Sequence, residues 1–351
     1  MAETVDDIMV RCPLKHEVRD LLWVPYARRI CASGPLRKYL TLYSPPMMDI
    51  KHLHSKGLLR SDGESYEGVV AVTYKEEHYA EAMTKSGGRP ALLLSGNINH
   101  LLTQPDSDDA RRLRGEFPFQ VINLDYTKSL FGQANRQSVS AHLEAIEEIV
   151  RLQHRARCDE FALLLTTRSE QGDSHHRNQF TRRFLRDLSQ RIDDNLGQNP
   201  EFAQSFRRHF GPADGRALLR SRYDSFVPLG IAKLVAGILA QHSYEIASAD
   251  GRLLVRDGGK HVRSLLHLAF HVRGAVLPRT SELRVLGRPR AFYFERTLAE
   301  FVDKIGNGSV TLLKESADRR RLQTKHGRRV RELAMQTLNL PVPEPKTRGQ
   351  T

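Results

Sequence analysis

Apolar runs alternate with amphipathic stretches between residues 38 and 173 of the chain. The runs read as strands, and they cover residues 38–44, 66–74, 90–96, 117–126 and 160–169. Stretches 47–59 and 76–88 predict helices that end at glycine, and 104–116 is polar and predicts a loop. The spacing of Leu143, Ile146, Ile149, Val150 and Gln153 predicts a longer helix. Strands that are apolar throughout and alternate with helices favour a parallel sheet covered on both faces, so we expect an α/β, doubly wound, mostly parallel sheet over residues 38–173.

The pattern changes on either side of this core. Residues 1–37 predict an N-terminal helical segment anchored by Leu21, Leu22, Trp23 and Val24. Residues 174–243 predict a helical insertion, because Phe180, Phe184, Leu188 and Ile192 recur every four residues. We expect 244–310 to continue the sheet, with four features: a hairpin with an Asp-Gly turn in 243–259, an alternating strand over 263–274, a strand over 290–295 and a helix marked by Leu298, Phe301, Val302 and Ile305. A basic helix over 311–339 and a disordered tail over 340–351 complete the expected organisation.

Basic residues exceed acidic ones, and the surplus is concentrated. The 351 residues include 54 Lys plus Arg against 41 Asp plus Glu, a net charge of +13. Residues 314–331 hold eight basic residues against two acids, and 177–191 hold five arginines against one acid. Either run alone is typical of a solvated helix face. Together with the global surplus they favour a nucleic-acid partner, RNA or DNA. The arginines and lysine that we expect to contact phosphates are Arg182, Arg183, Arg186, Arg319, Arg320, Arg321, Lys325, Arg328 and Arg329.

Other classes of protein lack support in the sequence. The three cysteines are far apart, which argues against a disulfide framework and a CxxC metal site. The adjacent His175 and His176, and the pair His267 and His271 about 13 Å apart on one strand, do not have ligand spacing, so no metal is expected. Neither a signal peptide nor a run of about 18 apolar residues is evident, which favours a cytoplasmic protein without membrane association.

Ligands of open α/β sheets bind at the carboxyl ends of the strands, which directs attention to the residues that end each predicted strand. The fourth strand ends in Asn123, Asp125 and Tyr126. Asp125 could orient an exocyclic amine, with Asn123 as helper and Tyr126 stacking on a base; the alternative is an Asp that caps a helix or a loop. Gly96 and Asn97 could hold an adenine edge or form an ordinary Gly-Asn turn.

The segments VVAVTYKEEHYAEA, ALLLSGNINHLL and FQVINLDYTKSLF resemble, in order and character, a class I S-adenosylmethionine-dependent methyltransferase. VINLDYTKSL resembles the strand-four motif of tRNA guanine dimethyltransferases, and RSLLHLAFHVRG is similar to the apolar strand that follows their catalytic core. The resemblance covers a little over a third of the chain. It implies a Rossmann-like methyltransferase core and S-adenosylmethionine as cofactor. Catalytic roles would fall to Asp125, Asn123 and Tyr126, and cofactor contacts to Tyr43, Ser44, Asp49, Thr73, Tyr74, Gly96 and Asn97.

Three motifs depart from that family. The first strand ends in Tyr43 and Ser44 followed by two prolines, where the family has an acidic residue and a glycine-rich turn. Thr73 stands where a carboxylate should accept the ribose hydroxyls, and Tyr126 with Thr127 replaces Pro-Phe. We therefore keep three hypotheses: methyl transfer to a base amine in RNA or DNA, a catalytically inactive binding or scaffold component of a multi-protein bacterial system such as phage defence, and a different Rossmann-type enzyme.

Overall fold

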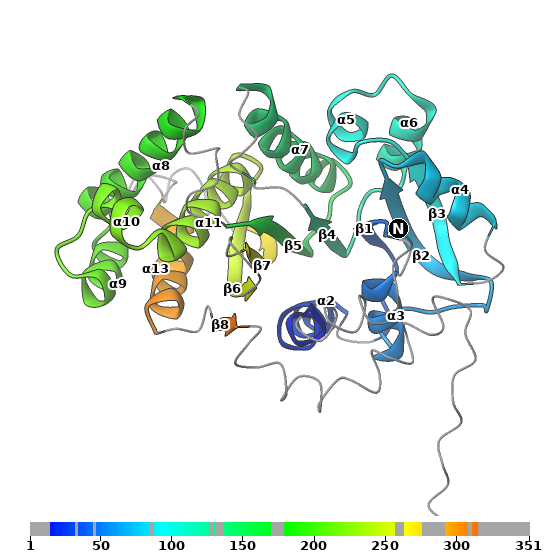
Figure 1. Ribbon diagram of the computed structural model, residues 1–351, viewed down its shortest axis with the longest axis horizontal. Coiled ribbons are helices and arrows are strands. Elements are labelled where there is room, and N and C mark those ends of the chain that lie inside the picture. Colours follow the sequence, from blue (N-terminus) through cyan, green and yellow to red (C-terminus); the bar gives the residue numbers. More distant parts are fainter. Residues whose placement is uncertain are drawn as a thin grey trace, which may run out of the picture.

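The computed structural model describes residues 15–31, 34–44, 47–84, 88–126, 130, 136–169, 179–256, 263–275, 292–307 and 311–314. Helices flank a single mixed sheet in these residues (Figure 1). The predicted basic residues from Arg319 to Arg329, the pair His175 and His176, and the tail from residue 340 lie outside the described residues.

The sheet has eight strands in the order β3-β2-β1-β4-β5-β7-β6-β8. Their bounds are β1 Tyr39–Leu42, β2 Ser65–Thr73, β3 Arg89–Ser95, β4 Val121–Asp125, β5 Glu160–Arg168, β6 Tyr244–Arg256, β7 Arg263–Gly274 and β8 Thr311–Lys314. Strands β1 to β5 are parallel, whereas β7 runs antiparallel to both β5 and β6. The order 3-2-1-4-5 is that of doubly wound nucleotide-binding folds. An antiparallel β7 between β5 and β6 makes the fold methyltransferase-like, as predicted.

Helices cover both faces of this sheet. They are η1 Arg19–Trp23, α2 Val24–Ile30, α3 Met48–Ser55, α4 Glu76–Thr84, α5 Ile98–Thr103, α6 Asp108–Gly115, α7 Arg136–Arg155, α8 Gln179–Gln198, α9 Pro200–Phe210, α10 Gly215–Ser221, α11 Tyr223–Gln241 and α13 Phe292–Gly306. Figure 1 shows α5, α6 and α7 above the sheet and α2 and α3 below it. The helices α8 to α11 follow β5, in the segment where the sequence predicts a helical insertion.

The larger core lies between the sheet and the helices on the side of α7. Ile146, Ile149 and Val150 of α7 are fully buried there, as their spacing predicts. Burying a side chain of this size contributes about 1.5–3 kcal/mol relative to leaving it exposed. Gln153, which continues the same stripe, is also fully buried, and its amide bonds to both the backbone N and O of Phe119. The polar end of the stripe therefore fixes the segment that leads into β4.

The opposite face is covered by the N-terminal helical segment, residues 15–30, and by α3. Leu22 and Trp23 pack there against small residues of the sheet, among them Ala162 of β5 and Ala269 of β7. Small side chains on the strands leave room for the large ring of Trp23. Because this helical segment lies next to the carboxyl ends of β4 and β5, it brings its own charged residues to the predicted site.

Four expectations about secondary structure are wrong. Residues 290–295 were expected as a strand, but α13 begins at Phe292, because a short apolar run does not distinguish a strand from the first turn of an apolar helix. The polar segment 104–116 contains α6, which Ser107 caps by accepting from the N–H of Ala110. Polar residues such as Ser107 start helices, but they are also common in loops, so a polar segment does not distinguish the two.

The other two corrections concern the far edge of the sheet. Asp250-Gly251 is not a turn, since β6 passes through it and pairs Gly251 with Leu268 of β7. Tyr26 donates to the Asp250 carboxylate at 2.7 Å, so this carboxylate has a hydrogen-bond donor although it lies within strand β6. Residues 311–314, expected as the start of a basic helix, form β8 and pair in parallel with 252–255 of β6.

Candidate functional site

The parallel strands bring their carboxyl ends to one edge of the sheet, but the three predicted catalytic residues do not form one constellation there. Asn123 is buried, and its amide donates toward the hydroxyls of Tyr39 at 3.1 Å and Thr41 at 3.3 Å. Tyr126 points to the other side, donates to Asn99 Oδ1 at 3.1 Å and packs its ring 4.4 Å from the ring of His142. Asp125 alone remains partly open, with 28% of its side chain exposed.

Asp125 is held by a cation from the N-terminal helical segment. Lys15 Nζ lies 3.4 Å from Asp125 Oδ2. Burial opposes ionisation of Asp125, but the positive charges of Lys15 and Arg19 outweigh it and hold the pKa of this carboxyl below its usual value. His267 faces the same carboxylate. Burial lowers the pKa of His267 to about 3, so its ring is neutral at physiological pH and the lysine and arginine are the charges that act on Asp125.

Three buried side chains beside Asp125 present hydrogen-bonding atoms that lack a partner in the part of the chain that the structure describes. Arg19, only 5% exposed, leaves Nε and Nη1 unpaired, and its guanidinium lies 5.5 Å from the centre of the Trp23 ring. The Nε1 atom of Trp23 and the Nε2 atom of His267 also lack partners. The other ring nitrogen of His267 bonds to the Thr166 hydroxyl at 2.8 Å. Buried nitrogen atoms without an acceptor are costly, so these atoms lower the stability of this part of the fold.

Asp49 and Tyr43, predicted to contact a cofactor after β1, lie in protein contacts. The Asp49 carboxylate accepts from the Tyr39 hydroxyl at 2.9 Å and from Thr41 at 2.7 Å, and Asn123 Nδ2 lies 3.4 Å from it. Tyr43 is buried, and burial raises the pKa of its hydroxyl to about 12. Ser44 is exposed. The Asp49 carboxylate is therefore engaged in hydrogen bonds inside the protein.

The predicted cofactor residues after β2 and β3 are divided between buried and exposed positions. Thr73 is buried and its hydroxyl accepts from the N–H of Lys75 at 3.3 Å, whereas Tyr74 is 71% exposed. Gly96 has φ +140°, and a Cβ there would lie 3.2 Å from Leu101. Asn97 caps α5 by accepting from the N–H of Asn99 at 3.0 Å. The Gly-Asn pair thus acts as a turn and helix cap, the alternative that the sequence left open.

The arginine-rich helices α8 to α10 carry several exposed arginines. Residues 179–222 hold nine arginines and five acidic residues. Arg182, Arg183 and Arg186, which we expected to contact phosphates, are exposed and form no ion pair within the described residues. Arg208 differs, because it pairs with Asp303 of α13 at 3.3 Å. We call Arg182, Arg183, Arg186, Arg191, Arg207 and Arg220 the arginine surface.

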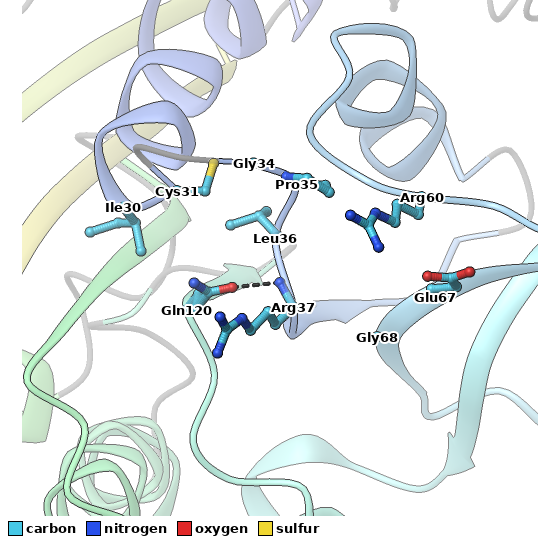
Figure 2. Close-up of a pocket in the computed structure, with 10 residues that line it drawn as sticks. All are labelled: Ile30, Cys31, Gly34, Pro35, Leu36, Arg37, Arg60, Glu67, Gly68 and Gln120. Carbon is cyan, nitrogen blue, oxygen red and sulfur yellow. Dashed lines mark hydrogen bonds between the residues drawn. The ribbon is translucent and has the colours of Figure 1, made fainter.

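A cavity of about 710 Å³ lies at the amino edge of the sheet, at the opposite end of the strands from Asp125. Figure 2 shows its walls, which come from the end of α2, the start of β1, the segment after α3 and the start of β2. The sequence does not predict this cavity, because ligands of doubly wound folds are expected at the carboxyl ends of the strands. Nor does it predict Lys15 and Arg19 at the carboxyl edge, since nothing in a helical pattern shows which strand end a helix will cover. His267 was considered only as a metal ligand, and its place beside Asp125 depends on the pairing of β7 with β5.

The described residues show neither a metal site nor a helix that stands apart from the core. Within them, no group of three or more His, Cys, Asp or Glu could hold a metal ion. By length and composition α11 could cross a membrane, but 67% of its most apolar window is buried inside the protein. That burial is typical of a core helix.

The strand order and the helices on both faces define a protein with a methyltransferase-like fold. Residues 12–272 match the PP_RS20740-like family, which is most of the chain. The chain therefore belongs to the PP_RS20740-like family. No curated protein matches it significantly.

Solved structures with a similar arrangement are distant. A protein from Pyrococcus horikoshii described as an RNA methyltransferase is 10% identical, with a TM-score of 0.32 over 75% of this chain and 84% of that one. A SAM-dependent methyltransferase from Methanosarcina mazei is 13% identical, with a TM-score of 0.30 over 68% and 93%. A protein from Rhodobacter sphaeroides described as a Zn-dependent alcohol dehydrogenase is 12% identical, with a TM-score of 0.31 over 70% and 88%. Likenesses at this level assign no activity, and the resemblance to tRNA guanine dimethyltransferases stays a prediction.

Proposed function

We propose that this protein binds nucleic acid through its arginine surface, and that its methyltransferase-like domain serves as a binding module without methyl transfer. The single observation that carries the proposal is that α8, α9 and α10 carry six exposed arginines without an ion pair among the described residues. Arginine forks match phosphate oxygens, and unpaired exposed guanidinium groups lose no internal partner on binding. A protein partner and a role in bacterial defence stay predictions from the sequence.

The carboxyl edge supports the second half of the proposal. S-adenosylmethionine needs an available carboxylate for its ribose hydroxyls and a close backbone approach for its methionine part. Here β2 ends in the buried Thr73, and Asp49 already accepts two hydroxyl hydrogen bonds from β1. These residues do not fit the cofactor.

Binding of RNA or DNA is tested by fluorescence anisotropy over a range of salt. We expect the logarithm of the binding constant to fall linearly with the logarithm of salt concentration. The variant carrying Arg182→Gln, Arg183→Gln and Arg186→Gln should bind more weakly to every sequence, with a slope reduced by up to about 3. The matched control is Arg111→Gln with Arg112→Gln, two exposed arginines on α6 that pair with Asp108 and Asp109. Equal losses in both variants, or binding that salt does not weaken, would overturn the proposal.

Methyl transfer to a base amine is the second candidate, because the ionised and partly exposed Asp125 ends β4. Calorimetry with S-adenosylmethionine and S-adenosylhomocysteine separates the two functions. Our proposal expects no heat of binding up to about 1 mM, which corresponds to a binding free energy weaker than about −4 kcal/mol. Binding below that concentration, lost in Asp49→Asn and accompanied by methyl transfer that Asp125→Ala abolishes, would establish the enzyme instead.

A further inference from the structure

We propose that the cavity at the amino edge of the sheet binds a nucleoside monophosphate. Ligands of doubly wound folds bind at the carboxyl edge, so this site is separate from the one that the fold suggests. Its volume of about 710 Å³ is in the range of ligand pockets, about 300–1,000 Å³. It also lies on other elements than the arginine surface, and the proposal does not depend on that surface.

Two arginines line the cavity and are available for a phosphate contact. Arg37 precedes β1 and Arg60 follows α3, and Figure 2 shows the Arg60 guanidinium extended across the cavity toward the side of Leu36 and Arg37. Both side chains are exposed and neither forms an ion pair among the described residues. The Arg37 guanidinium extends toward the side of Gln120, away from Arg60 (Figure 2). Both arginines line the cavity without a carboxylate partner among the described residues; such groups are suited to an oxyanion, and the fork geometry favours phosphate.

The remaining walls suit a nucleoside. The lining includes the apolar side chains of Ile30, Pro35 and the buried Leu36, against which a base can pack. Glu67 and Gln120 add polar groups: a carboxylate that accepts from hydroxyls or ring amines, and an amide nitrogen that donates. The charges of Arg37, Arg60 and Glu67 sum to +1. That sum matches a monophosphate better than a triphosphate, whose extra charges Glu67 would repel.

The backbone holds the Arg37 side of the cavity in place. The N–H of Arg37 donates to Gln120 Oε1 at 2.5 Å, and that of Leu36 donates to the Leu58 carbonyl at 2.9 Å. Gly68 of β2 has φ +68°, and a Cβ on it would lie 1.9 Å from the Arg37 carbonyl oxygen. The close approach requires glycine, and it fixes the turn from which Arg37 projects. A site that is already ordered before binding loses less conformational entropy when the ligand binds.

Isothermal titration calorimetry of the full chain tests the site, with the 5′-monophosphates of adenosine, guanosine, cytidine and uridine as probes. Unmodified nucleosides and inorganic phosphate are the comparison ligands. We expect a monophosphate to bind at least about tenfold more tightly than its nucleoside and than phosphate alone, since base and phosphate contact different walls. A 5′-phosphorylated dinucleotide distinguishes a free nucleotide from the end of a strand, which carries the same chemistry.

The variants Arg60→Gln and Arg37→Gln should each weaken monophosphate binding by about tenfold or more and leave nucleoside binding unchanged. Arg111→Gln, an exposed arginine far from the cavity, should bind as the unmodified protein does, and circular dichroism checks that each variant is folded. The triple variant of α8 should retain nucleotide binding, which separates this proposal from the one for the arginine surface. The absence of monophosphate binding at about 10 mM, or affinities that neither arginine affects, would overturn it.

Discussion

Lys15 and Asp125 are 110 positions apart in the chain, yet Lys15 Nζ lies 3.4 Å from Asp125 Oδ2 at the end of β4. The pair joins the N-terminal helical segment to the residue that the sequence marks as catalytic. A helix that had been expected only to pack on the sheet thus controls the ionisation of its carboxyl edge.

Replacing Lys15 tests this control. Lys15→Met removes a charge that lowers the pKa of Asp125, and a carboxyl with a lowered pKa contributes stability above its usual pKa that is lost as the pH falls. We expect the free energy of unfolding to decrease less between pH 7 and pH 3 than in the unmodified protein. Because both side chains are partly exposed, the coupling energy in a double-mutant cycle with Asp125→Asn should be about 1 kcal/mol or less. Lys75→Met, which removes an exposed pair with Glu77, is the control and should leave the acid limb unchanged.

The buried guanidinium of Arg19 should be destabilising. Arg19→Met retains most of the aliphatic bulk and removes the buried Nε and Nη1 atoms that lack an acceptor among the described residues, but it also gives up the attraction to Asp125. Because an apolar side chain of similar volume often replaces a buried charge without loss, we expect urea denaturation to show a net gain of about 1 kcal/mol. Arg111→Met on the surface should change stability by less than about 0.5 kcal/mol. A loss of stability in Arg19→Met would contradict our description of this side chain.

His267 should make the fold sensitive to mild acid. Its pKa is lowered to about 3 by burial, whereas the unfolded chain protonates near the ordinary value of 6.5. Between these values the unfolded state binds more protons, so stability falls as the pH falls, by up to about 1.4 kcal/mol per unit. His267→Asn should flatten the dependence of the urea midpoint on pH between 7 and 4. His100→Asn, at an exposed position on α5, should preserve it. If the urea midpoint of His267→Asn depends on pH as steeply as that of the unmodified protein, the acid sensitivity comes from other groups.

Replacing Gly68 should destabilise the fold at the amino edge of the sheet. Gly68→Ala places a methyl group 1.9 Å from the Arg37 carbonyl oxygen and requires φ +68° of a residue with a Cβ, so we expect a loss of about 2 kcal/mol or more in thermal or urea unfolding. Gly237 in α11 offers the opposite case, since a Cβ there meets nothing within 4 Å. Gly237→Ala should stabilise the protein by about 0.5–1 kcal/mol. Similar effects of the two changes would contradict the close approach at Gly68.

The sequence predicts the fold well where a pattern is long, and less well where it is short. The stripe from Leu143 to Gln153 keeps helical spacing over about three turns of α7. The six residues from 290 to 295 are too few to show whether a strand or a helix begins. The site is harder to predict. A predicted strand shows which residues lie at its carboxyl end, but it does not show which helix packs over that end. Asp125 could be placed at an edge, but its neighbours Lys15 and Arg19 come from a helix whose position depends on tertiary packing.

Asp49, Asn123, Tyr39 and Thr41 join α3, β4 and β1 by hydrogen bonds within the interior. Strand β1 has only four residues, and alternation means that a slip of one position would turn Tyr39 and Thr41 to the opposite face. Asp49 would then be left buried without its hydroxyl donors, at a cost of several kcal/mol. These hydrogen bonds therefore select the register of β1. An apolar strand this short could pair with its neighbours in several registers, but the four polar residues find their partners in only one of them.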